Sequence, residues 1–158
     1  MRNTIKTALK DNNFVFQTLK EDSEQLILKF GINLENGRCD TYIDLQVEAE
    51  RVLIFTVLPV SVPQNKRSRM AEFITHANYG LISGNFEMCM TDGEIRYKNV
   101  YIFDNTFPNS TDVFIRNMYV TFHMVDRYLP GIMSVIYANV DPAVAIHQIE
   151  SVVDPSFN

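Results

Sequence analysis

Residues 26–47, LILKFGINLENGRCDTYIDLQV, contain the pattern that decides the fold. Polar and apolar residues alternate on both sides of Asn36-Gly37, a dipeptide that two-residue type I′ turns prefer because both positions need a positive φ. The sequence therefore predicts a β-hairpin in which Glu35 lies opposite Arg38 and the apolar residues of both strands share one face. The predicted dry face carries Leu26, Leu28, Phe30, Ile32, Leu34, Cys39, Thr41, Ile43, Leu45 and Val47.

Residues 77–103, ANYGLISGNFEMCMTDGEIRYKNVYIF, predict a helix end followed by a second hairpin. Asp92-Gly93 provides the turn, which places Thr91 opposite Glu94. In this register apolar residues again face each other, and so do opposite charges.

Periodicity predicts the remaining elements. A long helix runs from Thr111 or Asp112 toward Ala138, and we expect Pro130 to kink it without ending it. Its broad apolar face carries Phe114, Met118, Phe122, Val125, Leu129, Ile132 and Ile136. The other expected elements are a short helix at 4–10, strands at 14–19 and 51–58, a helix at 63–77 closed by Gly80, and a last helix at 142–152.

The predicted fold is α+β, with helices packed on an antiparallel sheet that combines a four-strand meander and a C-terminal hairpin. The element order is α-β-β-β-β-α-β-β-α-α. We expect residues 1–158 to form a single domain, because no linker or repeat interrupts them.

Composition narrows the classes of partner. The net charge of −5 disfavours binding to duplex nucleic acid, and no apolar run reaches the roughly 20 residues of a membrane span. The two cysteines are too few for a disulfide framework, and the N-terminal residues do not resemble a signal peptide. We therefore expect a soluble cytoplasmic protein with no nucleic-acid or membrane partner.

No residue pattern predicts catalysis. His76, His123 and His147 lie on three different predicted helices, without ligands at metal-binding spacing. Cys89 would lie across from Arg96, but no general base is close to it in sequence, so a packed or edge cysteine is the better interpretation. We expect no catalytic residue, no metal and no cofactor, and hence a protein that is not an enzyme.

Lys66, Arg67 and Arg69 form a basic cluster in the first turns of the second helix. Positive charge at this position opposes the helix dipole. The cluster therefore indicates an acidic partner, an intramolecular carboxylate, or a solvated basic turn.

The long helix also carries a second, narrower apolar stripe of Val120, Met124, Tyr128 and Val135. Because one sheet buries only one side of a helix, this stripe is either covered by the C-terminal helix or exposed as a partner or dimer surface.

From residue 62 onward the chain resembles the YbjN-type domain family, which has a type III secretion chaperone-like fold. The resemblance rests on AEFITHANYGL at 71–81, SGNFEM at 83–88, the DGEI turn at 92–95 and VDRYLPGI at 125–132. It implies an α+β domain with a non-enzymatic role, either binding another protein or acting as an accessory regulator in bacterial stress or sensory responses. The chaperone-like relatives pair as dimers, so the resemblance also implies a homodimer, and it brings no catalytic residues.

The sequence therefore favours a protein-binding module whose partner it does not identify. The alternative is a small-molecule or lipid-binding domain with a pocket between the sheet and the long helix, lined from the chain's seven methionines and eleven phenylalanines.

Overall fold

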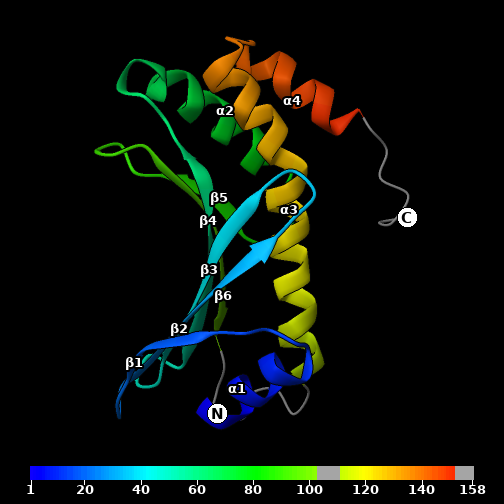
Figure 1. The fold of residues 1–158 in the computed structure, drawn as a ribbon. Helices are drawn as coiled ribbons and strands as arrows, with labels where there is room; N and C mark the ends of the chain where they lie inside the picture. The colour runs from blue at the N-terminus through cyan, green and yellow to red at the C-terminus, as the bar shows by residue number, and fades with distance from the viewer. Residues whose placement is uncertain (103–110, 152–158) are drawn as a thin grey trace.

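The computed structural model describes residues 1–102 and 111–151 of the chain (Figure 1). Phe103 and Val152, the expected ends of the second hairpin and the last helix, lie outside the described residues. The elements are α1 (Arg2–Asp11), β1 (Gln17–Glu21), β2 (Gln25–Asn33), β3 (Arg38–Gln46), β4 (Arg51–Ser61), a 3-10 turn η1 (Gln64–Lys66), α2 (Arg67–Tyr79), β5 (Asn85–Met88), β6 (Glu94–Ile102), α3 (Thr111–Tyr137) and α4 (Pro142–Glu150). This order confirms the predicted α+β fold.

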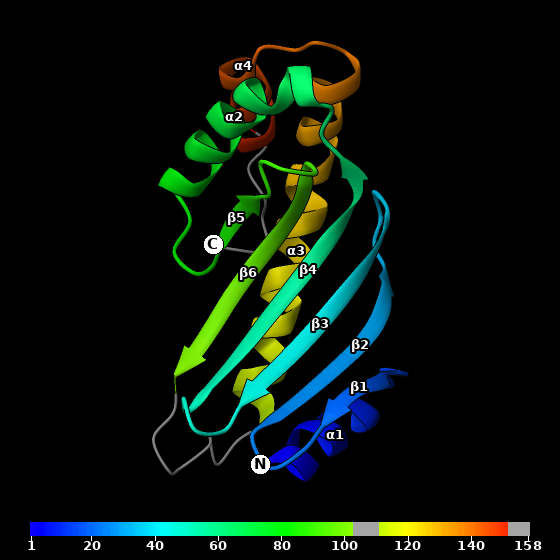
Figure 2. The ribbon, with the colours of Figure 1, turned by 90° about the vertical axis from the view of Figure 1, so that its left-hand side faces the viewer.

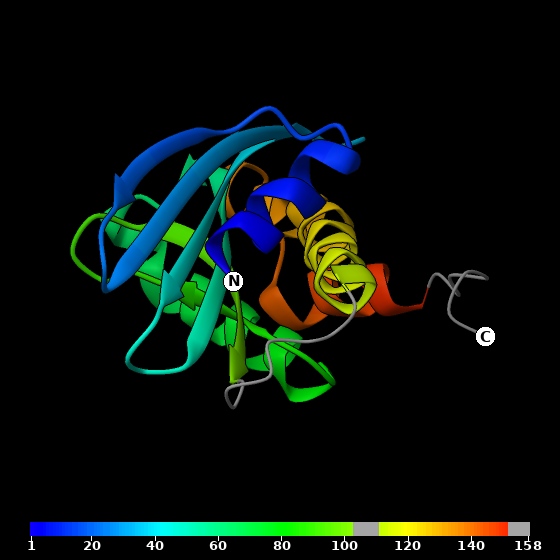
Figure 3. The ribbon, with the colours of Figure 1, turned by 90° about the horizontal axis from the view of Figure 1, so that it is seen from below.

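The strands form one six-stranded antiparallel sheet in the order β1-β2-β3-β4-β6-β5. The long helix α3 runs along one face of this sheet, and α1 lies on the same side (Figures 2 and 3). The helices α2 and α4 pack together at one end of the sheet (Figure 1). The opposite face of the sheet carries no helix among the described residues.

The core consists of two apolar clusters that share α3. One cluster joins the second half of α3 to α2, α4 and one end of the sheet, and the other joins its first half to α1 and the other end. All seven predicted core residues of α3 are buried, and the helix continues through Pro130. Buried side chains of the sheet and of α3 belong to the same apolar clusters.

On the open face of the sheet, two stacked aromatic rings lie between two cationic side chains. The rings of Tyr42 and Phe55 stack nearly parallel, with centroids 5.1 Å apart and planes at 11°. The Lys29 ammonium lies 5.3 Å from the centre of the Tyr42 ring, and the Arg96 guanidinium lies 5.3 Å from that of Phe55. These cation–π contacts join β2, β3, β4 and β6 on the face that no helix covers.

The first hairpin keeps its predicted faces but not its predicted turn. Ile32 pairs with Cys39 and Leu28 with Ile43, which is a shift of two residues from the predicted register. Gly37 does not have a positive φ, so the type I′ turn was wrong, and residues 34–37 form a longer loop. Because side chains alternate with a period of two, this shift keeps every residue on its predicted face, and the predicted dry face is buried or half-buried along its length.

The longer loop is explained by a contact with α3. The Asp126 carboxylate accepts hydrogen bonds from the backbone N–H groups of Glu35 (3.3 Å) and Asn36 (2.8 Å). The Asn36 side chain donates in return to the Asp126 carbonyl at 3.1 Å. A contact with a residue 90 positions away in the sequence thus fixes the conformation of the loop. Turn preferences describe only neighbouring residues, so they do not predict this contact.

The second hairpin shows the same shift of two residues, since Met88 pairs with Ile95 and Glu87 with Arg96. Cys89 therefore does not lie across from Arg96, and it is exposed. Gly93 does adopt a positive φ of 81°, and a Cβ there would lie 2.2 Å from the carbonyl oxygen of Val62. This loop too is shaped by a distant segment, because the backbone of Val62 binds it.

We expect replacement of Asp126 by alanine to lower the free energy of unfolding by about 1–2 kcal/mol, because two loop N–H groups lose a charged acceptor. Glu72→Ala is the matched control, since it also exchanges a helical carboxylate for alanine, at an exposed position of α2. Urea unfolding of both variants measures the difference. Equal stability of D126A and E72A would contradict this role of Asp126.

Candidate functional site

The second apolar stripe of α3 is divided between the core and the surface. Tyr128 and Val135 are 3% and 0% exposed and belong to the cluster that includes α4. Val120 and Met124 are only half-buried. Two residues of the stripe therefore belong to the core, and the other two are partly accessible.

Val120 and Met124 line a groove of about 540 Å³. Leu81 and Ile82, which precede β5, form its other wall, and the end of α4 contributes Glu150. We call this feature the apolar groove. Its lining is mainly apolar, as in surfaces that bind the side chains of a partner.

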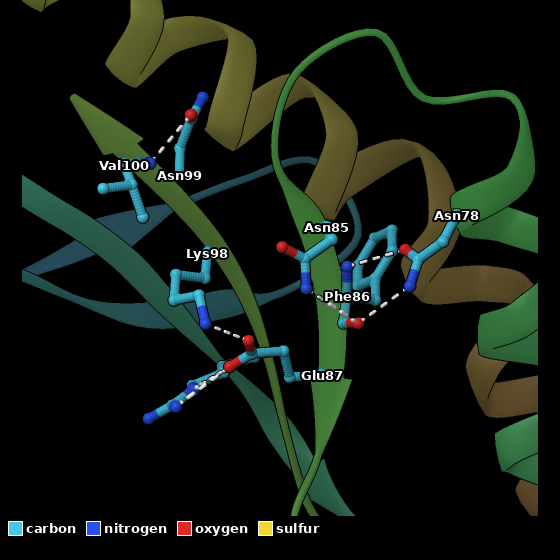
Figure 4. Close-up of polar contacts among 8 residues, drawn as sticks. Asn78, Asn85, Phe86, Glu87, Lys98, Asn99 and Val100 are labelled. Carbon is cyan, nitrogen blue, oxygen red and sulfur yellow. Dashed lines mark hydrogen bonds and ion pairs between the residues drawn. The ribbon is translucent and has the colours of Figure 1, made fainter. Parts of the chain in front are cut away.

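The wall of the apolar groove is held in place by Asn78, at the end of α2 (Figure 4). The Asn78 side chain accepts a hydrogen bond from the Phe86 N–H at 2.8 Å and donates one to the Phe86 carbonyl at 3.0 Å. One carboxamide thus satisfies both backbone groups of a residue on edge strand β5. This contact closes the edge there and joins the strand to the helix.

A second set of contacts holds residues 83–84. The Tyr97 hydroxyl donates to the Ser83 carbonyl, and the Asn99 side chain donates to the Ser83 hydroxyl at 3.0 Å. Gly84 has a φ of 74°, and a Cβ at this position would lie 2.6 Å from the Tyr97 ring. Buried residues of β6 therefore fix the end of the loop that precedes β5.

Two large side chains at this loop point into solvent. Tyr79 is 96% exposed and Ile82 is 103% exposed. We call residues 79–82 the loop tip. Sequence reasoning assigned these residues to a helix end and missed their exposure; the available signal was a pair of large apolar residues close to Gly80 and Gly84.

Charges of both signs lie at the apolar groove. The Arg127 guanidinium lies 5.9 Å from the centre of the Tyr128 ring. The Tyr128 hydroxyl donates to Glu150 at 2.9 Å. Burial, together with this bond to a carboxylate, raises the pKa of Tyr128 to about 12, so the hydroxyl remains a donor at physiological pH. The bond ties α4 to the groove.

The basic cluster makes contacts within the chain. Arg67 donates to the carbonyls of Val62 (3.1 Å) and Met90 (3.0 Å), and so joins α2 to the β5–β6 loop. Arg69 donates to the carbonyl of Val140 at 3.1 Å, beyond the end of α3. Within residues 1–102 and 111–151, the hydrogen bonds of Arg67 and Arg69 thus go to backbone carbonyls, and Arg67 also interacts electrostatically with the Asp92 carboxylate.

Arg69 also donates to the Asn139 carbonyl at 3.3 Å. Lys66, at the start of α2, is half-buried. The cluster lies apart from the residues that line the apolar groove.

The described residues contain no group of three or more His, Cys, Asp or Glu side chains that could hold a metal ion. Burial raises the pKa of the Cys39 thiol to about 11, which leaves it protonated and unreactive at neutral pH. Within the same residues, no helix has both the length and the apolar character that a bilayer requires.

A family model described as "YbjN: Putative bacterial sensory transduction regulator" matches residues 2–132. The crystal structure of YbjN from E. coli, described as "a putative transcription regulator", is similar with a TM-score of 0.55 and 15% identity, over 88% of this chain and 91% of that one. An uncharacterized protein from Methanothermobacter thermautotrophicus is similar with a TM-score of 0.57 and 16% identity, over 87% and 97%. Among curated proteins, none matches the chain significantly. At these identities the two structures show the fold alone.

We expect Asn78→Ala to lower the free energy of unfolding by about 1–3 kcal/mol, because two backbone groups of Phe86 lose their partner. Hydrogen exchange at the Phe86 amide should become faster by more than that at neighbouring amides. Asn85→Ala is the control, since the Asn85 side chain donates to the Phe86 carbonyl at 3.3 Å and its removal leaves the Phe86 N–H bound to Asn78. Unchanged protection of the Phe86 amide in N78A would refute this role.

Proposed function

The chain belongs to the YbjN family, and from this premise we propose that it is a non-enzymatic protein-binding module. It acts in the bacterial cytoplasm as an accessory regulator in a stress or sensory response, or as a chaperone-like protein that holds an apolar segment of a client. The family description supports a regulatory role. A type III secretion chaperone-like use of the fold is part of the proposal.

The observation that carries this proposal is the apolar groove with the loop tip beside it. Val120 and Met124 remain accessible at the groove, on a helix that buries most of its apolar residues and also exposes Val113, Tyr119, Met133 and Tyr137, which do not line the groove. Ile82 is in solvent at the groove's other wall, although a large apolar side chain gains about 1.5–3 kcal/mol when it is buried. A partner that inserts apolar side chains here would bury both walls together.

The groove favours protein over a reactive small molecule as the ligand. Its charged groups are Arg127 and Glu150, and Glu150 already accepts the Tyr128 hydroxyl. Neither histidines nor cysteines line it. Its chemistry is therefore that of a binding surface, with an apolar floor and a polar rim.

Met124→Glu tests the proposal with reduced, carboxymethylated α-lactalbumin, a permanently unfolded model client. We expect the variant to bind this client at least about tenfold more weakly than the wild type, because the carboxylate loses hydration when the groove is filled. Fluorescence anisotropy of labelled client measures the affinity. Ile82→Glu should have the same effect, and it keeps the test valid if M124E is unstable, because Ile82 is fully exposed.

Val15→Glu is the matched control, since Val15 is an apolar residue that is 92% exposed and lies between α1 and β1, away from the groove. It should bind the client as the wild type does. If I82E and folded M124E also keep wild-type affinity, the apolar groove is not the binding site.

A further inference from the structure

We propose that Asn36 is a site of spontaneous deamidation, and that the contact between the β2–β3 loop and α3 controls this reaction. While the loop is docked on α3, Asn36 is protected. Once the loop has undocked, the reaction proceeds, and its product does not dock again. This modification site depends neither on the apolar groove nor on the proposed function.

Asn36-Gly37 is the single Asn-Gly dipeptide of the chain. In the reaction, the backbone nitrogen of Gly37 loses its proton and attacks Cγ of Asn36. A bond forms between these two atoms, the bond from Cγ to Nδ2 breaks, and the side-chain nitrogen takes up a proton and leaves as ammonia. Water then opens the cyclic succinimide and leaves aspartate or isoaspartate at position 36. Glycine favours the attack, because it has no side chain that hinders the approach of its nitrogen.

The structure shows why a carboxamide stands at position 36. In a regular α-helix the Asp126 carbonyl would accept a hydrogen bond from the N–H of residue 130, but this residue is Pro130, which has no N–H. The Asn36 side chain donates to the same carbonyl at 3.1 Å. It therefore supplies the donor that the proline lacks.

Glycine at position 37 allows the loop to approach α3 closely. A Cβ there would lie 2.9 Å from the Leu129 side chain and 3.5 Å from that of Pro59, so a larger residue would have to displace Leu129. Docking on α3 thus uses both residues of the dipeptide. This contact, and not a type I′ turn, accounts for a chemically labile pair at this position.

Docking restrains the groups that must move in the reaction (Figure 1). The Asn36 N–H donates to the Asp126 carboxylate at 2.8 Å, and the Leu34 N–H donates to the Gly37 carbonyl at 2.8 Å. The leaving nitrogen is the one that donates to the Asp126 carbonyl. For the Gly37 nitrogen to reach Cγ, the Asn36 side chain must turn away from α3. The reaction therefore requires a local opening of the loop.

The product does not fit the docked position. Both products carry a carboxylate at position 36, which accepts hydrogen bonds but donates none. It would face the Asp126 carbonyl oxygen without a bond, and it would bring a second negative charge close to the Asp126 carboxylate. Deamidation is thus a one-way change that keeps the loop away from α3.

The rate of deamidation in matched variants tests the control by docking. The whole chain is kept in mildly alkaline buffer, and mass spectrometry of its peptides measures the conversion of Asn36. We expect the folded wild type to react at least about tenfold more slowly than the same chain unfolded in urea. Asp126→Ala should accelerate the reaction of the folded protein by at least about fivefold, because the loop loses its charged acceptor.

Asn78→Ala is the matched control, since it removes a comparable contact elsewhere and leaves the loop bound to Asp126. Its rate should stay within about twofold of the wild-type rate, because local opening of the loop does not require global unfolding. The inference is overturned if Asn36 stays intact in the unfolded chain or reacts equally fast in the folded one. It is also overturned if D126A reacts no faster than the wild type or than N78A.

Asn36→Asp tests the one-way character, because it carries the carboxylate of the product. Hydrogen exchange at the amides of residues 35 and 36 should be at least about fivefold faster than in the wild type. Asn33→Asp is the control, since it adds the same charge at an exposed position of β2 and should leave both amides protected. Wild-type protection of both amides in N36D would show that the product docks, and would overturn the one-way change.

Discussion

The contact between α3 and the inner face of the sheet is the constraint on which the rest of the structure depends. An antiparallel sheet with one dry face needs a cover, and α3 contributes buried side chains to both apolar clusters. Hydrogen bonds to this helix, or to the residues just after it, hold other parts of the structure in place. Asp126 holds the β2–β3 loop against it, and Arg69 joins its end to α2. Met124 of this helix also lines the apolar groove.

The sequence was sufficient for properties that depend on side-chain periodicity. The order of elements, the dry face of the first hairpin and the core face of α3 are as predicted. The spacing of apolar residues in a strand or helix shows which of its faces is buried. The register was wrong by two residues in both hairpins, and the turn type of the first hairpin was also wrong. In each case a distant group binds the loop, Asp126 in the first and Val62 in the second, and no local pattern reveals such a partner.

The residues that carry the family resemblance are mostly structural. Asn78 pairs with the backbone of Phe86, Ser83 receives bonds from two side chains of β6, and Gly84 leaves room for the Tyr97 ring. The resemblance therefore predicted the fold well and the site only in part. These contacts hold the loop tip in a position where Ile82 is exposed to solvent. Half of the predicted stripe on α3 belongs to the core, because α4 packs over it.

The stack on the open face of the sheet has a consequence for what that face can recognise. Proteins that read unpaired nucleobases from a sheet usually offer an aromatic ring with one face free for stacking. Here each ring already has both faces occupied, since Tyr42 lies between Lys29 and Phe55, and Phe55 lies between Tyr42 and Arg96. A base would have to displace an ammonium or a guanidinium before it met a ring. The two cations thus cover the outer faces of the stacked rings, and these faces make contacts within the sheet.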